Sequence, residues 1–183
     1  NFEYSYNQHH ATILPDYDNN PDTLDLLIFD NGQTRFTRDR ELQCAIAAHE
    51  IVAPERYSRL VHYRINEKNA TVEQIWQYGK ERGEELYAQW RGSAQLLENK
   101  NVLGFFNKMH DPTGEIANSG NVVEVNRDGE LIWDAELFSK GDRGNFLGYR
   151  AFRYPIYFSD DTELDIYAEA KNLIPQELLD QNK

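Results

Sequence analysis

The sequence contains five histidines, and a neutral imidazole ring is a competent nucleophile near neutral pH. Two of them, His9 and His10, follow Gln8 and directly precede an apolar segment, residues 11–14, with the pattern of a β-strand. A histidine pair at the entrance to a strand can face a ligand site, although adjacent histidines more often lie solvated on a surface. His9 and His10 are therefore candidate functional residues, and a surface pair is the alternative.

The other three histidines lie in patterns that predict no catalytic or metal site. His49-Glu50 would begin a zinc-protease motif, but Ala53 stands where that motif needs its second histidine. His62 lies in an alternating segment and is expected to be half-buried in a sheet, so that its loss should mainly affect stability. His110 lies in a predicted loop. The sequence has no glycine-rich phosphate loop and no paired metal-ligand motif, so we expect neither a cofactor nor a metal.

Charge and hydropathy exclude several classes of partner. The formal net charge is −12, and no cluster of Lys and Arg offsets it, so nucleic-acid binding is not expected. The longest apolar runs, such as residues 102–106, are too short to cross a membrane. The single cysteine, Cys44, excludes an internal disulfide. The chain opens without an initiator Met or a signal pattern, and we interpret it as an interior part of a longer protein.

An internal repeat indicates the fold. Residues 60–66 and 70–76 alternate like two strands around a polar turn, and residues 121–126 and 130–133 do the same around Asp-Gly. Both hairpins end in Ile-Trp. Each is preceded by a short strand and an apolar strand: residues 11–15 and 25–32 before the first hairpin, and residues 93–97 and 101–107 before the second. Four antiparallel strands in a repeated order are typical of a β-propeller blade.

The predicted fold class is therefore all-β, as part of a β-propeller, with a two-sheet sandwich as the alternative. We place the blades in residues 1–158, with an insertion at about 33–56, and expect a last edge strand at 149–158. Residues 159–183 read as an acidic, helical tail that could pack on the propeller or join a homodimer. Two blades cannot close a ring of four to eight, which again indicates an incomplete propeller.

Several motifs of this repeat resemble the C-terminal part of the bacterial aryl-sulfate sulfotransferases. They are Gln8-His9-x-Ala11, Phe29-Asp30-Asn31-Gly32, Tyr57-Ser58-Arg59 with Tyr63-Arg64-Ile65, and the long run from Thr71 to Gly83. The last motif is specific because of its length, whereas Asp-Asn-Gly alone is a weak signal. The resemblance covers about residues 4–157 and implies the final blades of a six-bladed propeller behind a small N-terminal β-sandwich.

The resemblance implies an enzyme that moves a sulfuryl group from a phenolic sulfate ester to a phenol by a ping-pong mechanism, without a nucleotide sulfate donor. It implies that His9, which follows the motif's glutamine, becomes transiently sulfated, with His10 as the alternative nucleophile. Arg91, Ser93 and His10 are the candidate substrate-binding residues. Arg91 and Ser93 lie in residues 87–93, where the sequence departs from the family pattern, and the alternative is that Ser93 only begins a strand and Arg91 is solvated. Helper residues are implied in the remaining N-terminal part of the protein. A periplasmic or exported location is also implied.

The runner-up interpretation is a propeller of the same lineage that has lost its chemistry and serves as a binding scaffold. The two readings differ in the upstream blades. Histidine and arginine facing His9 would favour the enzyme, and apolar residues there would favour the scaffold.

Overall fold

A computed structural model describes residues 2–14, 17–33, 35, 56–108, 119–138 and 148–154. The chain divides into two compact units, residues 1–152 and residues 153–183. The predicted helical tail and most of the insertion at 33–56 lie outside the described residues, as do His49 and His110. Within the described part, no helix is long and apolar enough to span a membrane.

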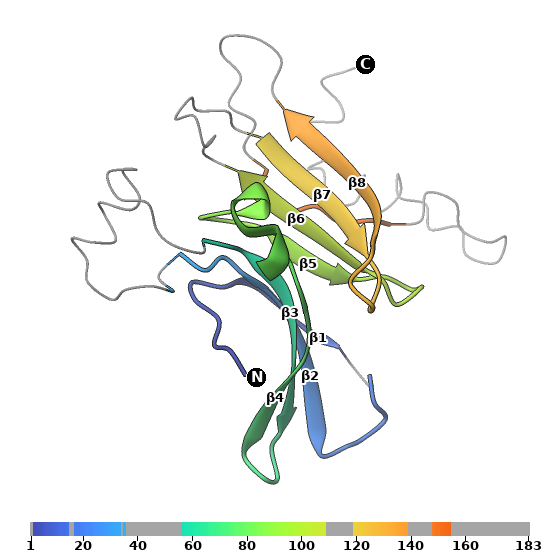
Figure 1. The fold of residues 1–183 in the computed structure, drawn as a ribbon. Coiled ribbons are helices and arrows are strands. Elements are labelled where there is room, and N and C mark those ends of the chain that lie inside the picture. The colour runs from blue at the N-terminus through green and yellow to red at the C-terminus, as the bar shows by residue number, and fades with distance from the viewer. Residues whose placement is uncertain are drawn as a thin grey trace, which may run out of the picture. The chain divides into compact units, whose positions relative to one another are not determined.

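Eight strands form two antiparallel four-stranded sheets, in which each strand pairs with the next one in sequence (Figure 1). The first sheet consists of β1 (His9–Leu14), β2 (Thr23–Asp30), β3 (Arg59–Asn66) and β4 (Thr71–Tyr78). The second consists of β5 (Ser93–Leu96), β6 (Val102–Lys108), β7 (Ser119–Val125) and β8 (Leu131–Phe138). The eight strands predicted for the two repeated units are confirmed. A 3₁₀ segment, η1 (Lys80–Leu86), joins the sheets and was not predicted. The prediction of an edge strand at 149–158 is wrong for the described residues 149–154, which form no strand, and residues 155–158 lie outside the described ranges.

The two sheets share one apolar core. It combines Leu27 and Phe29 of β2 with residues of the second sheet such as Val102 and Phe106 of β6. The rings of Phe29 and Phe106 meet edge to face, with centroids 5.0 Å apart. Because side chains alternate along a strand, the neighbouring residues of β6, Leu103 and Phe105, lie in a second cluster instead.

Equivalent side chains of the two sheets point in the same direction. In the first sheet Leu27 pairs with His62, which pairs with Trp76. In the second sheet Leu103 pairs with Glu124, which pairs with Trp133. Leu27 and Leu103 are therefore equivalent, yet Leu27 faces the shared core and Leu103 faces the separate cluster. Equivalent faces thus point the same way, as in a repeated stack and unlike a sandwich whose sheets face each other. The described residues form two stacked sheets and do not close into a ring.

The β7–β8 turn of the second sheet reaches into the first sheet. Arg127 of this turn donates from Nη2 to Nδ1 of His62 at 2.7 Å, and its guanidinium lies 4.6 Å from the ring centroid of Trp76. A guanidinium cannot accept a hydrogen bond, so Nδ1 of His62 must be the acceptor, and Nε2 donates to Asp25 at 2.5 Å. Burial and the charge of Arg127 lower the pKa of His62, although the bond to Asp25 opposes this. His62, predicted to be half-buried, is fully buried and neutral in this role.

Close packing between the sheets predicts the effect of one substitution. Gly92, just before β5, has φ 113°, and an added Cβ would lie 2.4 Å from the ring of Phe29. Gly92→Ala should therefore combine backbone strain of about 1 kcal/mol with an overpacking cost of about 1–3 kcal/mol.

Gly129→Ala is the matched control, because Gly129 also has a positive φ of 87° but its Cβ would meet nothing within 4 Å. Chemical denaturation should show a clearly larger loss of stability for Gly92→Ala than for Gly129→Ala. Equal losses would mean that the sheets are not packed together at Phe29.

Candidate active site

His9 and His10 lie at the start of β1, where the strand carries a bulge. The pairing with β2 shifts between His9, opposite Phe29, and Thr12, opposite Leu27. His10 is therefore the extra residue of the bulge. Its φ is 48°, in the left-handed region that L-residues seldom occupy. Strained bulges of this kind are over-represented next to functional sites. The bulge gives the two neighbouring histidines different partners.

A buried amide fixes the imidazole of His9. Nδ1 of His9 lies 2.6 Å from Oδ1 of Asn31, which directly follows β2 and is fully buried. The amide nitrogen of Asn31 donates to the backbone carbonyls of Ala88 and Arg91, both at 2.7 Å. Two carbonyl acceptors require the NH₂ group at that position, so the orientation of the amide is determined. Oδ1 of Asn31 is then an acceptor, and Nδ1 of His9 must carry the proton.

The bond to Asn31 determines which ring nitrogen of His9 is reactive. A neutral imidazole with its proton on Nδ1 has its lone pair on Nε2. Nε2 is therefore the nitrogen that can act as a nucleophile or bind a proton. The acceptor for the second ring nitrogen was not identified from the sequence, although Asn31 belongs to one of the motifs that carried the resemblance. The missing information was the register that brings residues 9 and 31 together.

Ser58 holds the backbone of Asn31 and of Ala88 in place. Its hydroxyl accepts from the backbone N–H of Ala88 at 2.8 Å and donates to the backbone carbonyl of Asn31 at 2.8 Å. Ser58 is fully buried and lies directly before β3. Asn31, Ser58 and Ala88 thus connect the ends of β2 and β3 to the loop that leads into β5. The loop at 88–91 is in turn what orients the amide toward His9.

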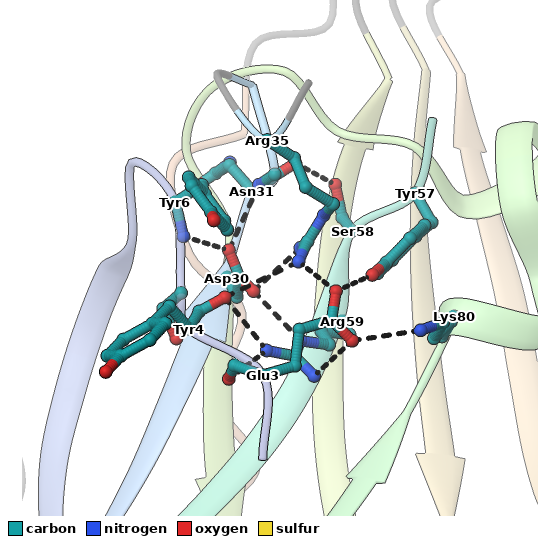
Figure 2. Close-up of polar contacts among 12 residues, drawn as sticks. Glu3, Tyr4, Tyr6, Asp30, Asn31, Arg35, Tyr57, Ser58, Arg59 and Lys80 are labelled. Carbon is teal, nitrogen blue, oxygen red and sulfur yellow. Dashed lines mark hydrogen bonds and ion pairs between the residues drawn. The ribbon is translucent and has the colours of Figure 1, made fainter. Parts of the chain in front are cut away.

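A buried ionic network lies next to this amide (Figure 2). Asp30 and Arg59 are both fully buried, and Oδ2 of Asp30 accepts from Nε of Arg59 at 2.9 Å and from Arg35 at 2.8 Å. The other oxygen of Asp30 accepts from the backbone N–H groups of Tyr6, at 2.7 Å, and Gly32, at 3.2 Å. Asp30 thus fixes the backbone at Tyr6, three residues before His9, and at Gly32, directly after Asn31.

Glu3 completes the network from the N-terminal segment. Its carboxylate contacts Arg35, Arg59, Lys80 and the hydroxyl of Tyr57. Burial alone would raise the pKa of Glu3, but the Tyr57 hydroxyl and the cations outweigh it and lower the pKa to about 2. Burial and the bond to Glu3 raise the pKa of Tyr57. Glu3 is therefore ionised and Tyr57 is a neutral donor at physiological pH.

His10 has a separate set of partners. The backbone N–H of Ala94, in β5, donates to Nδ1 of His10 at 3.1 Å, so in the neutral ring the proton lies on Nε2. Its ring meets Phe152 edge to face, with centroids 5.3 Å apart. Burial and the charge of Arg150 lower the pKa of His10. His10 thus connects β1 to the second sheet as a neutral ring.

Arg91 lies in the loop before β5 and Ser93 is the first residue of β5, and their side chains have different roles. The backbone of Arg91, with φ 67°, supplies a carbonyl to Asn31, and its side chain is half-buried. Ser93 is fully buried, and its hydroxyl both donates to the carbonyl of Ala151 and accepts from the N–H of Ala151, each at 3.1 Å. A substrate contact by Ser93 would have to break one of these bonds. Arg91 remains the more accessible of the two predicted contacts.

Sequence reasoning assigned no functional role to residues 148–152, most of which it predicted as part of an edge strand, and these residues lie beside the two histidines. Their backbone is held by Gly92, which donates to the carbonyl of Tyr149 at 3.2 Å. The ring of Tyr149 is 53% exposed and meets His9 edge to face, with centroids 6.3 Å apart. The exposed guanidinium of Arg150 lies 5.2 Å from the Tyr149 ring. Aromatic and cationic groups therefore lie beside both histidines, although the chain as a whole is acidic.

Two further observations bear on chemistry. Among the described residues, no group of three or more His, Cys, Asp or Glu side chains could hold a metal ion. Within the same ranges, the buried Asp30 is occupied by Arg59 and Arg35 and is not available as a base.

Comparison with known proteins gives a consistent result. A protein-family model described as Arylsulfotransferase (ASST) matches residues 1–150. The chain is similar to the arylsulfate sulfotransferase AssT of Lelliottia amnigena, with 39% identity over 105 residues, which is 57% of this chain and 15% of that protein. It is also similar to AssT of Escherichia coli O6:H1 strain CFT073, with 34% identity over 110 residues, 60% of this chain and 16% of that protein. The matched part thus spans about one sixth of these relatives' length.

The Asn31 amide predicts a measurable loss on truncation. Asn31→Ala removes the donors to two carbonyls and the acceptor for His9, so the free energy of unfolding should fall by about 2–3 kcal/mol. Chemical denaturation of the whole protein measures it.

Asn20→Ala provides the control, because Asn20 is exposed and its side-chain oxygen accepts from the backbone N–H of Asp22, at 3.0 Å, in a surface turn. It should therefore cost markedly less than Asn31→Ala. If the two variants lost the same stability, the clamp on the 88–91 loop would contribute nothing.

Proposed function

The chain belongs to the arylsulfotransferase family, whose model matches residues 1–150, and on this basis we propose that its protein transfers a sulfuryl group from a phenolic sulfate ester to a phenol through a sulfated His9. The observation that carries the proposal is the bond between Nδ1 of His9 and Oδ1 of Asn31. It leaves the lone pair of Nε2 for attack on sulfur. No nucleotide sulfate donor takes part.

In the first half-reaction, Nε2 of His9 attacks the sulfur of the aryl sulfate. The N–S bond forms as the S–O bond to the aryl group breaks, and the electron pair of that bond leaves on the phenolate. By analogy with phosphoryl transfer, the transition state is loose, and its equatorial oxygens need positioned donors. Nε2–H of His10 and the guanidinium of Arg91 are the groups of this chain that we assign to that task.

The second half-reaction is favoured because the group that accepts the hydrogen bond from Nδ1 of His9, the Asn31 amide, is neutral. Asn31 is an amide and cannot take up the proton of Nδ1, so the sulfated ring remains a protonated imidazolium. A protonated imidazole is a good leaving group from sulfur. An acceptor phenol that loses its proton can therefore attack sulfur and form the new S–O bond, while the N–S bond breaks and the electron pair returns to Nε2. The groups that exchange protons with the two phenols are proposed to lie in the remaining N-terminal part.

Tyr149 and Arg150 support the choice of an aromatic, anionic substrate. The exposed ring of Tyr149 meets His9 at its edge and can pack against an aryl group. Arg150, held over Tyr149, adds positive charge beside the two histidines and suits a sulfate or a departing phenolate. Ser93, whose hydroxyl is engaged by Ala151, is proposed to act mainly by holding this segment in place.

We also propose that the two sheets are successive blades of a propeller completed by the rest of the protein. The one-directional stacking of equivalent faces supports this, since a sandwich would place its apolar faces against each other. A six-bladed ring, a homodimer and a periplasmic or exported location rest on the family resemblance and on the acidic tail, and stay predictions.

Covalent labelling tests the proposal. The full-length protein is exposed briefly to p-nitrophenyl sulfate, and phenol release and peptide masses are measured. We expect a sulfuryl group on His9, with no label and no turnover in His9→Ala, because that variant loses the only lone pair that Asn31 orients.

His10→Ala is the control for the neighbouring ring, and it should slow turnover while keeping the label on His9. A label on His10 would contradict the assignment of the nucleophile. An unlabelled protein that releases no phenol from several aryl sulfates would instead favour the binding scaffold.

A further inference from the structure

Two polar contacts between the sheets differ in their chemistry. At one end of the interface, the amide of Asn31 donates to two carbonyls of the 88–91 loop, and an amide does not ionise near neutral pH. Further along the sheets, Arg127 of the β7–β8 turn donates to Nδ1 of His62 at 2.7 Å. Histidine is the side chain that ordinarily gains its charge between about pH 5 and 8. The second contact can therefore respond to pH, whereas the first cannot.

The contact with Arg127 uses the one lone pair of the His62 ring. Nε2 of His62 donates to Asp25 at 2.5 Å and so already carries a proton, while Nδ1 accepts from Arg127. The next proton that the ring binds must therefore go to Nδ1, where Arg127 now donates. With that proton in place, Nδ1 becomes a donor that faces the N–H groups of a second cation. Protonation of His62 and its bond to Arg127 thus exclude each other.

Arg127 depends on His62 for its position. Its side chain is half-buried, and its Nη1 is buried without a hydrogen-bond partner among the described residues. Its guanidinium also contacts two rings, with 4.6 Å to the centroid of Trp76 and 5.6 Å to that of Tyr17. Burial lowers the pKa of Arg127, which reflects the cost of keeping a cation from water with part of its hydrogen-bonding capacity unused. Loss of the bond to His62 therefore leaves little to keep the guanidinium in place.

The groups around His62 make a charged ring unfavourable there, with one exception. The charged or titratable side chains that face it, from the β1–β2 loop, β2, β3 and the turns of the second sheet, are Tyr17, Asp18, Asp25, Arg64, Lys100 and Arg127. The neighbour on β4 is Trp76, which does not titrate. Burial, with the charges of Arg127 and Arg64, lowers the pKa of His62 below its ordinary 6.5, and only the Asp25 carboxylate opposes this. Asp25 is therefore the group that would stabilise an imidazolium at this position.

We propose that the contact between Arg127 and His62 is an acid-sensitive junction between the two sheets. A proton from solvent binds Nδ1 of His62, the guanidinium of Arg127 leaves, and the β7–β8 turn is released from the first sheet. Asp25 continues to accept from Nε2 of the charged ring. The Asn31 contact, which contains no titrating group, stays closed, so the sheets loosen at one end only. This inference concerns the joint between the sheets and is independent of the proposed transfer activity.

The junction makes the effect of one substitution depend on pH. Because the pKa of His62 is lowered in the folded protein, the unfolded chain binds this proton more readily. The stability that the neutral ring contributes is therefore fully present above about pH 6.5 and is lost as the pH falls toward the lowered pKa. Arg127→Met removes the competing cation and should reduce this loss.

Chemical denaturation of the full-length protein at about pH 8 and about pH 5 measures the effect. The stability of Arg127→Met relative to the unsubstituted protein should rise between the two pH values. His62→Gln is the control, because a glutamine can accept from Arg127 and donate to Asp25 but does not titrate. In that background the effect of Arg127→Met should be the same at both pH values. An effect of Arg127→Met that does not change with pH beside the native His62 would overturn the proposal, as would a change that persists in His62→Gln.

Hydroxyl-radical footprinting of the unsubstituted full-length protein tests the release without any variant. Oxidation of Trp76, which Arg127 covers, is compared with that of Trp90, which is 39% exposed in the loop held by Asn31. Each rate is measured by peptide mass spectrometry and divided by the rate in the unfolded protein at the same pH. From about pH 8 to about pH 5, we expect the rate for Trp76 to rise and that for Trp90 to stay constant. A Trp76 rate that does not rise, or a parallel rise at Trp90, would contradict a junction that opens at the His62 end alone.

Discussion

The Asn31 amide is the interaction on which the candidate site depends. It is fully buried, and each of its polar atoms is used: one by His9, the other by the carbonyls of Ala88 and Arg91. The amide therefore joins the first strand of one sheet to the loop that begins the other. Since its orientation is determined by the two carbonyls, the proton of His9 is determined as well. Packing between the sheets and the chemistry of the imidazole thus follow from the same group.

The ionic network beside Asn31 explains how such a group is held in place. Asp30 and Arg59 are both fully buried, and burying an ion pair costs several kcal/mol per ion unless further hydrogen bonds compensate. Here they do, because Asp30 also binds the backbone of Tyr6 and Gly32, and Arg59 also binds Gln74 and the carbonyl groups of the N-terminal segment. A network of this kind contributes little net stability but fixes the positions of the chain segments that carry His9 and Asn31.

Much of the fold could be predicted from the sequence, and less of the site. The eight strands and their order follow from local alternation and from the Ile-Trp repeat, both of which are readable in short windows. The partner of His9 was not readable, because it depends on a bulge at His10 and on the register that pairs β1 with β2. Tyr149 and Arg150 were missed for a related reason, since their contact with the histidines spans 140 residues of sequence and a segment with no regular structure. The predicted Arg91 contributes a backbone carbonyl, which no side-chain motif can indicate.

The tautomer of His9 is the most direct test of this account. In the full-length protein, ¹⁵N NMR of the histidine rings, assigned by comparison with His9→Ala, distinguishes a protonated ring nitrogen from one with a lone pair. At a pH where the ring is neutral, we predict a proton on Nδ1 and a lone pair on Nε2. The opposite tautomer, or an equal mixture of the two, would contradict the role of Asn31 and with it the assignment of Nε2 as the nucleophile.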